Sequence, residues 1–274
     1  MRFQPNAGHH GRMYDQIIEL ERAAARHWRG TEEAWLGGWL LRAAEGFTGR
    51  ANSALPLGDP GLPLDGALDT VVSWYQDRGL PPMIVVPVPL DSDSPGRELD
   101  GFLSERLWTA RPGPAFVMVA DLSDGTSPIH DCAASQLPPG ATFQVDHQPD
   151  QAWLAMYHYR GQDRQPAVMR DVLTSAPVQA FASIRAGDDV LAIGRLSIAD
   201  GWAGITAVEV TPARRRAGLG RALTGAVCAE AAKRDISRVF LQVETSNAAA
   251  ISLYERCGFR YSHRYHYRVA PTQD

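Results

Sequence analysis

The segment AVEVTPARRRAGLG, Ala207–Gly220, decides the fold of this chain. An apolar run leads into a Thr-Pro turn, three arginines and a Gly-x-Gly. This order predicts a strand that ends near Val210 and a helix that begins near Leu219. The first N–H groups of a helix have no partner within it, and the helix dipole adds partial positive charge there. The segment therefore predicts a site for a phosphate or pyrophosphate.

Composition indicates an ordinary folded protein and narrows its partners. The 274 residues are 45% hydrophobic and 21% charged, which suits two domains of about 130 residues or one large domain. A net charge of −4 argues against nucleic acid as a partner of the whole molecule. The arginine run Arg214–Arg216 is therefore interpreted as a local site, with a solvated basic surface as the alternative.

The cysteines Cys132, Cys228 and Cys257 are few and widely spaced. Their spacing indicates neither a metal site nor a disulfide framework, and we interpret Cys257 as a core residue. The N-terminal segment lacks the apolar core of a signal peptide, and apolar runs such as Met83–Leu90 are too short to cross a bilayer. We expect a cytoplasmic protein with no metal and no membrane partner.

The second half of the chain alternates strands and helices. The turns AGDD and ADGW separate three successive strands, which indicates antiparallel hairpins. The predicted strands are Ala141–Val145, Val178–Arg185, Val190–Ile198, Trp202–Val210, Val239–Thr245 and Phe259–Val269. The predicted helices are Asp150–Tyr159, Pro166–Thr174, Leu219–Arg234 and Ala248–Cys257.

The first half has a similar order of elements, with little sequence identity to the second. Its predicted helices are Asp15–Trp28, Leu64–Arg78 and Glu98–Trp108. Its predicted strands are Trp35–Ala43 and Phe47–Leu55, paired as a hairpin across AAEG, followed by Met83–Pro89 and Ala115–Asp121. This order suggests an internal structural repeat. The segment Ser123–Gly140 is rich in Gly, Pro and Ser and is the expected linker.

Two motifs of the second half together resemble the GNAT superfamily of acyl-CoA-dependent N-acyltransferases. The first is V-x-V-x-P-x-x-R-R-x-G-L-G at Val208–Gly220, and the second is N-x-x-A-x-x-L-Y-E-x-x-G-F at Asn247–Phe259. The resemblance covers roughly Ala141–Val269. A dinucleotide-binding fingerprint fits less well, because its acidic residue and its parallel strand are not evident.

The resemblance implies an α/β (α+β) fold with a mixed, mostly antiparallel sheet flanked by helices. The chain also resembles a bacterial subfamily of two-part GNAT proteins. This second resemblance implies a degenerate GNAT-like domain at 1–125, a linker at 126–140 and an active domain at 141–274. The first half lacks R-x-x-G-x-G. In its place Pro56, Pro60 and Pro63 remove backbone donors, and Asp59 and Asp65 repel phosphate, so this half should bind no coenzyme.

The resemblance further implies that the pyrophosphate belongs to coenzyme A, with acetyl-CoA as co-substrate. N–H groups from Arg216 to Arg221 would hold the pyrophosphate. The backbone of Val208–Val210 would pair with the pantetheine arm, where the strand diverges from the one starting at Val239, and an N–H near Val210 would stabilise an oxyanion. The implied coenzyme contacts are Val208, Glu209, Val210, Arg215, Arg216, Ala217, Gly218, Leu219, Gly220, Arg221, Asn247 and Tyr254. Asn247 is alternatively a helix cap alone.

Two side chains are candidates for the chemistry. Tyr254 would protonate the leaving thiolate, the alternative being a buried aromatic residue without such a role. Glu209 is the candidate general base, but family bases on this strand often lie several residues earlier. A water chain to the backbone, or the group of His263 and His266 near the C-terminus, therefore stays open as the base.

The expected function is transfer of an acetyl or small acyl group to an amine, by direct attack in a ternary complex. The expected partner is a small-molecule amine, and a homodimer is possible. The alternatives are a non-catalytic acyl-CoA sensor or partner-binding module, and an acetyltransferase for a protein N-terminus or for glutamate. Three polar residues of the first half have two possible roles. They either line an acceptor cleft between the halves or take part in structural pairing within the sheet: Arg42, Arg50 and Asn52.

Overall fold

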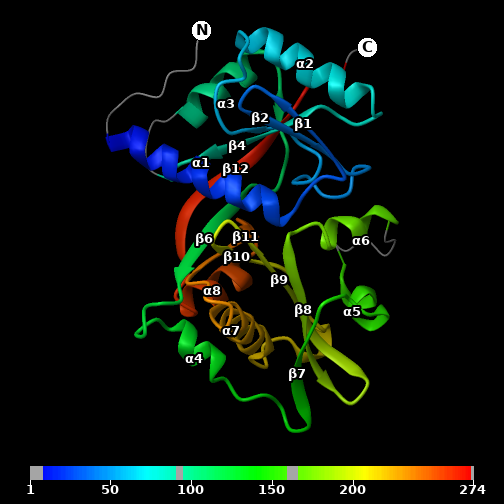
Figure 1. Cartoon of the computed structure of the whole chain (residues 1–274), viewed down its shortest axis with the longest axis vertical. Coiled ribbons are helices and arrows are strands. Elements are labelled where there is room, and N and C mark those ends of the chain that lie inside the picture. The colour runs from blue at the N-terminus through cyan, green and yellow to red at the C-terminus, as the bar shows by residue number, and fades with distance from the viewer. Residues whose placement is uncertain (1–8, 91–94, 159–165, 273–274) are drawn as a thin grey trace. The chain divides into compact units, whose positions relative to one another are not determined.

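The computed structural model describes residues 9–90, 95–158 and 166–272, and Figure 1 labels its elements. The chain divides into two compact units. Unit 1 comprises Met1–Phe116, Pro166–Ser175 and Ser262–Asp274, and unit 2 comprises Val117–Gln165 and Ala176–Tyr261. Two strands, β6 (Ala115–Asp121) and β12 (Arg260–Val269), therefore contribute residues to both units. The expected domain limits at 125 and 141 stay a prediction. The two units do not follow these limits, because unit 1 also includes Pro166–Ser175 and Ser262–Asp274 from the second half of the chain.

Unit 2 is built on a sheet in the order β7-β8-β9-β10-β11. The pairs β7–β8, β8–β9 and β9–β10 are antiparallel, and β10–β11 is parallel. The strands are β7 (Ala141–Asp146), β8 (Val178–Ala186), β9 (Asp189–Ala199), β10 (Trp202–Val210) and β11 (Arg238–Glu244). The predicted hairpins at AGDD and ADGW are confirmed.

Helix α7 (Leu219–Ala232) packs against β8, β9 and β10. The apolar side chains along one face of this helix are buried: Leu219, Leu223, Val227 and Ala231. Helix α5 (Gln151–Met156) contacts β9, and α8 (Ala248–Arg256) follows β11. A helix needs an apolar face on the sheet to be stable, and the Leu and Ala side chains of α7 supply it.

The expected linker 126–140 is only partly a linker. It contains α4 (Ile129–Ala133), which packs against α7, and the side chains of Ile129 and Cys132 are buried. The sequence did not reveal this helix, because its two buried residues are a single i, i+3 apolar pair within an otherwise polar stretch.

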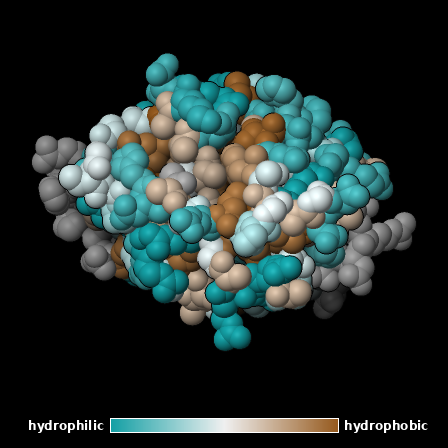
Figure 2. Space-filling view, turned by 90° about the horizontal axis from the view of Figure 1, so that it is seen from below, coloured by the Kyte–Doolittle hydropathy of each residue, from teal (hydrophilic) through white to brown (hydrophobic). Residues whose placement is uncertain are grey.

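Figure 2 views the end of the molecule where Figure 1 draws α4 and β7. Apolar side chains lie near the middle of this face, and hydrophilic side chains surround them.

Unit 1 has a small antiparallel sheet in the order β1-β2-β3, and a second pairing of β12 with β4 and β5. The strands are β1 (Glu32–Leu36), β2 (Trp39–Ala43), β3 (Leu55–Pro56), β4 (Met83–Val88) and β5 (Thr109–Ala110). The helices are α1 (His9–His27), α2 (Leu64–Gln76), α3 (Pro95–Glu105) and α6 (Val168–Leu173). Side chains from β2, α2, β4 and α3 form a buried apolar core that includes Trp39, Leu68, Ile84 and Leu103.

The predicted hairpin across AAEG is wrong. The chain turns earlier, at Gly37 and Gly38, so the predicted strand Trp35–Ala43 is split between β1 and β2. Gly37 has a φ of 53°, and a Cβ atom there would lie 2.3 Å from the carbonyl oxygen of Pro60. Only glycine fits this turn, and a Gly-Gly pair between apolar residues is itself a hairpin signal.

The predicted strand Phe47–Leu55 is also wrong, except for its last residue. Most of it is a loop organised by the buried side chain of Asn52. The Asn52 Oδ1 atom accepts from the N–H groups of Ala44 (2.8 Å) and Gly46 (2.9 Å). Its Nδ2 atom donates to the carbonyls of Phe47 (2.7 Å) and Thr48 (2.8 Å). A side chain that satisfies the backbone locally competes with strand pairing.

Replacing Asn52 by Ala should destabilise unit 1 by on the order of 2–4 kcal/mol, because buried backbone groups would lose their partners. Urea unfolding followed by tryptophan fluorescence measures the loss. Asp69→Ala, at an exposed position of α2, is the control and should change stability by less than about 0.5 kcal/mol. Equal effects of the two substitutions would contradict this role of Asn52.

Candidate functional site

The candidate site begins where β10 leaves its pairing with β11. The parallel register runs from Trp202–Arg238 to Ile205–Leu241, whereas the strands continue to Val210 and Glu244. The two strands thus pair at one end only. The divergence expected from the sequence agrees with this register.

A β-bulge in β10 lies at the same point. The register with β9 shifts between Thr206 and Glu209, and Ala207 has a φ of 54°. Gly194 of β9 is opposite the bulge, and a Cβ atom there would lie 3.7 Å from Val208 Cγ2 and 3.2 Å from Leu223 Cδ2. A bulge bends its strand and redirects its side chains. The bulge therefore decides which way Val208, Glu209 and Val210 point.

The arginine loop after β10 is exposed and contains two left-handed residues. A short 3₁₀ turn, Pro212–Arg214, is followed by Arg216 at φ 63° and Gly218 at φ 81°. From Pro212 to Gly218 every residue is exposed. The Arg215 Nε atom donates a long hydrogen bond, 3.4 Å, to the carbonyl of Val210. Arg215 is extended (φ −62°, ψ 150°), so the left-handed Arg216 and Gly218 each reverse the direction of the chain between Val210 and α7.

Helix α7 begins directly after this loop with an open N-terminus. Gly218 is its N-cap, and this glycine has no side chain to accept a hydrogen bond from the first turn. Gly220 lies against the neighbouring elements, because a Cβ atom there would be 3.2 Å from Leu253 Cδ2 and 3.8 Å from Val210 Cγ2. The open helix end is thereby brought beside the diverging end of β10.

The second motif forms helix α8. Asn247 is its N-cap, and the Asn247 Oδ1 atom accepts from the N–H of Ala250 at 3.1 Å; its contact with the coenzyme stays a prediction. Tyr254 is buried, with 7% of its surface exposed, and its ring packs edge-on against Phe259. Burial raises the pKa of the Tyr254 hydroxyl, and the nearby Cys257 and Cys228 raise it further. The hydroxyl is therefore protonated at neutral pH.

Glu209 has a specific partner that lies far away in sequence. One carboxylate oxygen accepts from the backbone N–H of His158 at 2.7 Å, and the other lies 3.6 Å from His158 Nδ1. Burial raises the pKa of the Glu209 carboxyl, and the hydrogen bond and charges of His158 and Arg215 oppose that rise. A carboxylate with a raised pKa is a stronger base than an exposed one.

Comparison with known proteins decides the family. A family model described as "Probable histone acetyltransferase Rv0428c C-terminal" matches residues 15–268. The chain belongs to this family and to the GNAT superfamily. The chain is 30% identical to the probable histone acetyltransferase Rv0428c of Mycobacterium tuberculosis over 266 residues. The match covers 94% of this chain and 74% of the relative.

Two solved structures share the fold of this GNAT protein. A GCN5-related N-acetyltransferase from Kribbella flavida has a TM-score of 0.66 at 16% identity and covers 98% of both chains. A tandem GNAT protein from the clavulanic acid biosynthesis pathway has a TM-score of 0.65 at 12% identity, over 100% of this chain and 99% of that one. The tandem architecture expected from the sequence is confirmed at the level of the fold.

One neighbour of the GNAT site was not foreseen. The backbone N–H of His158, two residues after the end of α5, donates to the Glu209 carboxylate. The two residues are 51 positions apart, and no local pattern links them. Only the packing of α5 on the sheet brings them together.

Several residues considered for the acceptor side have partners within unit 1. His263 is buried against Glu21 at 2.8 Å, and His266 lies 2.6 Å from Asp100. Arg42 is buried, and its Nε atom donates to the carbonyl of Ser53 at 3.2 Å. These contacts, like those of Asn52, join segments within unit 1. We therefore interpret His263, His266 and Arg42 as residues that stabilise this unit.

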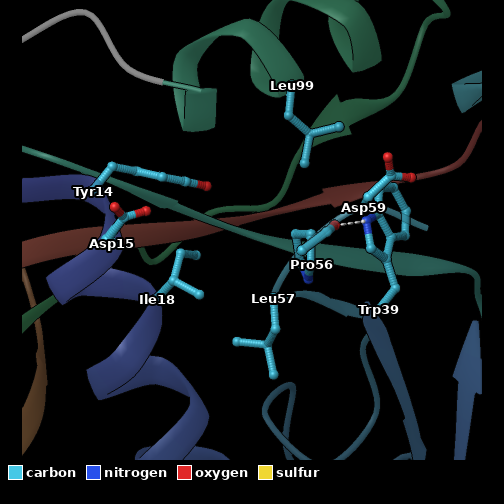
Figure 3. A pocket seen from close by; sticks show the side chains of 9 residues that line it. Tyr14, Asp15, Ile18, Trp39, Pro56, Leu57, Asp59 and Leu99 are labelled. Carbon is cyan, nitrogen blue, oxygen red and sulfur yellow. Dashed lines mark hydrogen bonds between the residues drawn. The ribbon is translucent and has the colours of Figure 1, made fainter. Parts of the chain in front are cut away.

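Unit 1 of this GNAT protein contains a cavity of about 200 Å³ (Figure 3). Tyr14, Asp15 and Ile18 of α1 and Leu99 of α3 form one side, and Trp39 and residues 56–59 form the other. The carboxylates of Asp15 and Asp59 make it unfavourable for a phosphate. Within the described ranges, we find neither a metal-binding cluster of His, Cys, Asp and Glu nor a helix long and apolar enough to cross a membrane.

Proposed function

We propose that this chain transfers an acetyl or other small acyl group from acetyl-CoA to the amine of a small molecule. The observation that carries the proposal is the open N-terminus of α7, which follows an exposed loop of arginines and left-handed residues beside the diverging end of β10. Membership of an acetyltransferase family supports the same reaction.

The residues of the loop fit the pyrophosphate of coenzyme A. Its two negative charges need several donors, and the first turn of α7 offers N–H groups that the N-cap residue, a glycine, does not bind. Arg215, Arg216 and Arg221 are exposed around that turn and add full positive charges. Gly220 lets the first turn of α7 pack closely against Leu253 and Val210, which holds the helix end beside β10.

Amine attack requires that the amine lose a proton. At neutral pH this costs roughly 4–5 kcal/mol for a lysine-like amine and about 1 kcal/mol for an α-amino group. We assign Glu209 as the base, because its carboxylate is held by the His158 N–H and its pKa is raised by burial. The bulge at Ala207 fixes the direction of the strand that carries it.

The leaving thiolate needs a hydrogen-bond donor or a proton. We assign this role to Tyr254, which is protonated because burial raises its pKa. A phenol with a raised pKa is a weaker acid than a thiol, whose pKa is near 8.5. Tyr254 would therefore act by donating a hydrogen bond to sulfur as negative charge develops there, and the coenzyme A thiolate would take its proton from solvent after the C–S bond breaks.

The second candidate acceptor is a lysine side chain of a protein. This acceptor is favoured by the similarity of the chain to the Mycobacterium tuberculosis relative, a probable histone acetyltransferase. A panel of small amines and lysine peptides, assayed by release of free thiol, separates the two acceptors. Binding of acetyl-CoA without thiol release for any member of the panel would favour a non-catalytic sensor.

Acetyl-CoA should bind to the wild-type chain in isothermal titration, and Gly218→Val should weaken binding by about tenfold or more, because a β-branched residue is strained at φ 81°. Gly187→Val is the matched control, since Gly187 also has a positive φ (60°) and open space around it but lies in the turn between β8 and β9. Both variants should lose similar stability. Undetectable binding to the wild type, or equal weakening by both variants, would contradict the proposed site.

Tyr254→Phe should lower turnover by about 10²-fold with nearly unchanged acetyl-CoA affinity, because only the hydroxyl is removed. Steady-state thiol release and titration measure the two quantities. Tyr261→Phe, which removes an exposed hydroxyl bonded to Glu255, is the control and should retain activity. Unchanged turnover in Tyr254→Phe would remove this residue from the reaction.

Glu209→Gln should lower kcat/KM by about 10²-fold and change its pH dependence. A base acts only when ionised, so wild-type kcat/KM should fall as pH drops through the Glu209 pKa, which lies above its ordinary value of 4.5. The variant should lack this acidic limb. Glu255→Gln, at an exposed position of α8, should keep the wild-type profile. An acidic limb that persists in Glu209→Gln would assign the base to another group.

A further inference from the structure

All three cysteines of the chain are buried in unit 2, on three different elements. Cys132 lies in α4, Cys228 in α7, and Cys257 is the C-cap of α8. The Sγ atoms of Cys132 and Cys257 are 2.6 Å apart. Non-bonded carbon atoms pack best at about 3.5–4.0 Å, and sulfur is larger, whereas a disulfide bond is about 2.05 Å long. The two sulfurs are closer than ordinary non-bonded contact allows.

The backbone around the two sulfurs is held in place by packing. Gly258 follows Cys257 at φ 86°, and a Cβ atom there would lie 3.1 Å from both Ser127 Oγ and Pro128 Cδ. The residues before α4 therefore lie against the turn after α8. Ile129 is buried beside Cys132 on the same face of α4, which packs on α7. The short distance is thus supported by contacts on both sides of each cysteine.

We propose that Cys132 and Cys257 form a modification site, a disulfide made by exchange with a low-molecular-weight disulfide such as glutathione disulfide. The Cys132 thiolate attacks one sulfur of the small disulfide and releases one small thiol. The Cys257 thiol then loses its proton and attacks the Cys132 sulfur of the mixed disulfide, which releases the second small thiol. Two protein thiols are oxidised and one small disulfide is reduced to two thiols.

Charge and burial give the two cysteines different roles. The guanidinium of Arg221, in the first turn of α7, lies beside Cys132, and this contact raises the pKa of Arg221. The thiolate is the attacking species in exchange, and a raised pKa disfavours it. Burial and the neighbouring Cys132 raise the pKa of Cys257, and burial raises the pKa of Cys228. Cys132 is therefore the attacking sulfur, and Cys257 the one that completes the bond.

The bond would join the expected linker to helix α8. Cys257 lies one turn after Tyr254 on this helix, so oxidation would tie the segment that carries the proposed hydrogen-bond donor to α4. Both sulfurs are fully buried, and the exchange therefore requires local opening of α4, a helix of five residues. Sub-denaturing urea should accelerate the exchange without changing its product.

The test is incubation of the full chain with glutathione disulfide, followed by alkylation, intact mass and peptide mapping. The expected product has lost two hydrogen atoms, keeps one alkylatable thiol, and yields a peptide pair joined through Cys132 and Cys257. The two sulfurs are 125 positions apart, so the oxidised chain should melt higher than the reduced chain by on the order of 5–10 °C.

Cys228→Ser is the matched control and should form the same cross-link and show the same shift in melting temperature. Cys132→Ser should retain two alkylatable thiols and show no shift. Because the mapping is done on the wild-type chain, the test does not depend on the folding of a variant. A cross-link through Cys228, a stable glutathione adduct on Cys132, or full alkylation of both cysteines with and without urea would overturn the proposal.

Discussion

The candidate site depends on the interruption of pairing between β10 and β11. Past Ile205 and Leu241 the backbone of β10 is released from its parallel neighbour, and the bulge at Ala207 redirects the rest of the strand. A buried strand edge is unfavourable unless something pairs with it. The protein places this edge beside the uncapped N-terminus of α7. In the proposed function, the same break in the sheet would provide a backbone edge for one segment of the coenzyme and helix-end donors for another.

Burial decides the chemistry of the side chains around this break. Glu209 and Tyr254 both have raised pKa values because both are withdrawn from water. The effect has opposite consequences for the two groups. It makes the carboxylate a stronger base, whereas it makes the phenol a weaker acid that remains a hydrogen-bond donor. The backbone N–H of His158 orients the carboxylate, so the segment that follows α5 contributes to the site although it carries no motif.

Unit 1 uses its polar residues differently. Asn52, Arg42 and the pair of His263 with Glu21 are buried with partners in the same unit. Buried polar groups that are satisfied in this way specify one arrangement of loops. The loop that occupies the place of a phosphate-binding turn is therefore organised by Asn52 and by glycines, and its carboxylate Asp59 faces a small cavity.

The sequence by itself determined the strands of the unit 2 sheet, the helices α5, α7 and α8, and the cap at Asn247, because each depends on neighbours within a few residues. Local reasoning misplaced the first hairpin by passing over Gly37 and Gly38, and it assigned a strand where Asn52 binds its own loop. Only the tertiary structure decided the contact of Glu209 with His158, the proximity of Cys132 and Cys257, and the return of the last strand to unit 1. These pairs are distant in sequence, and only the packing of helices on a common sheet brings them together.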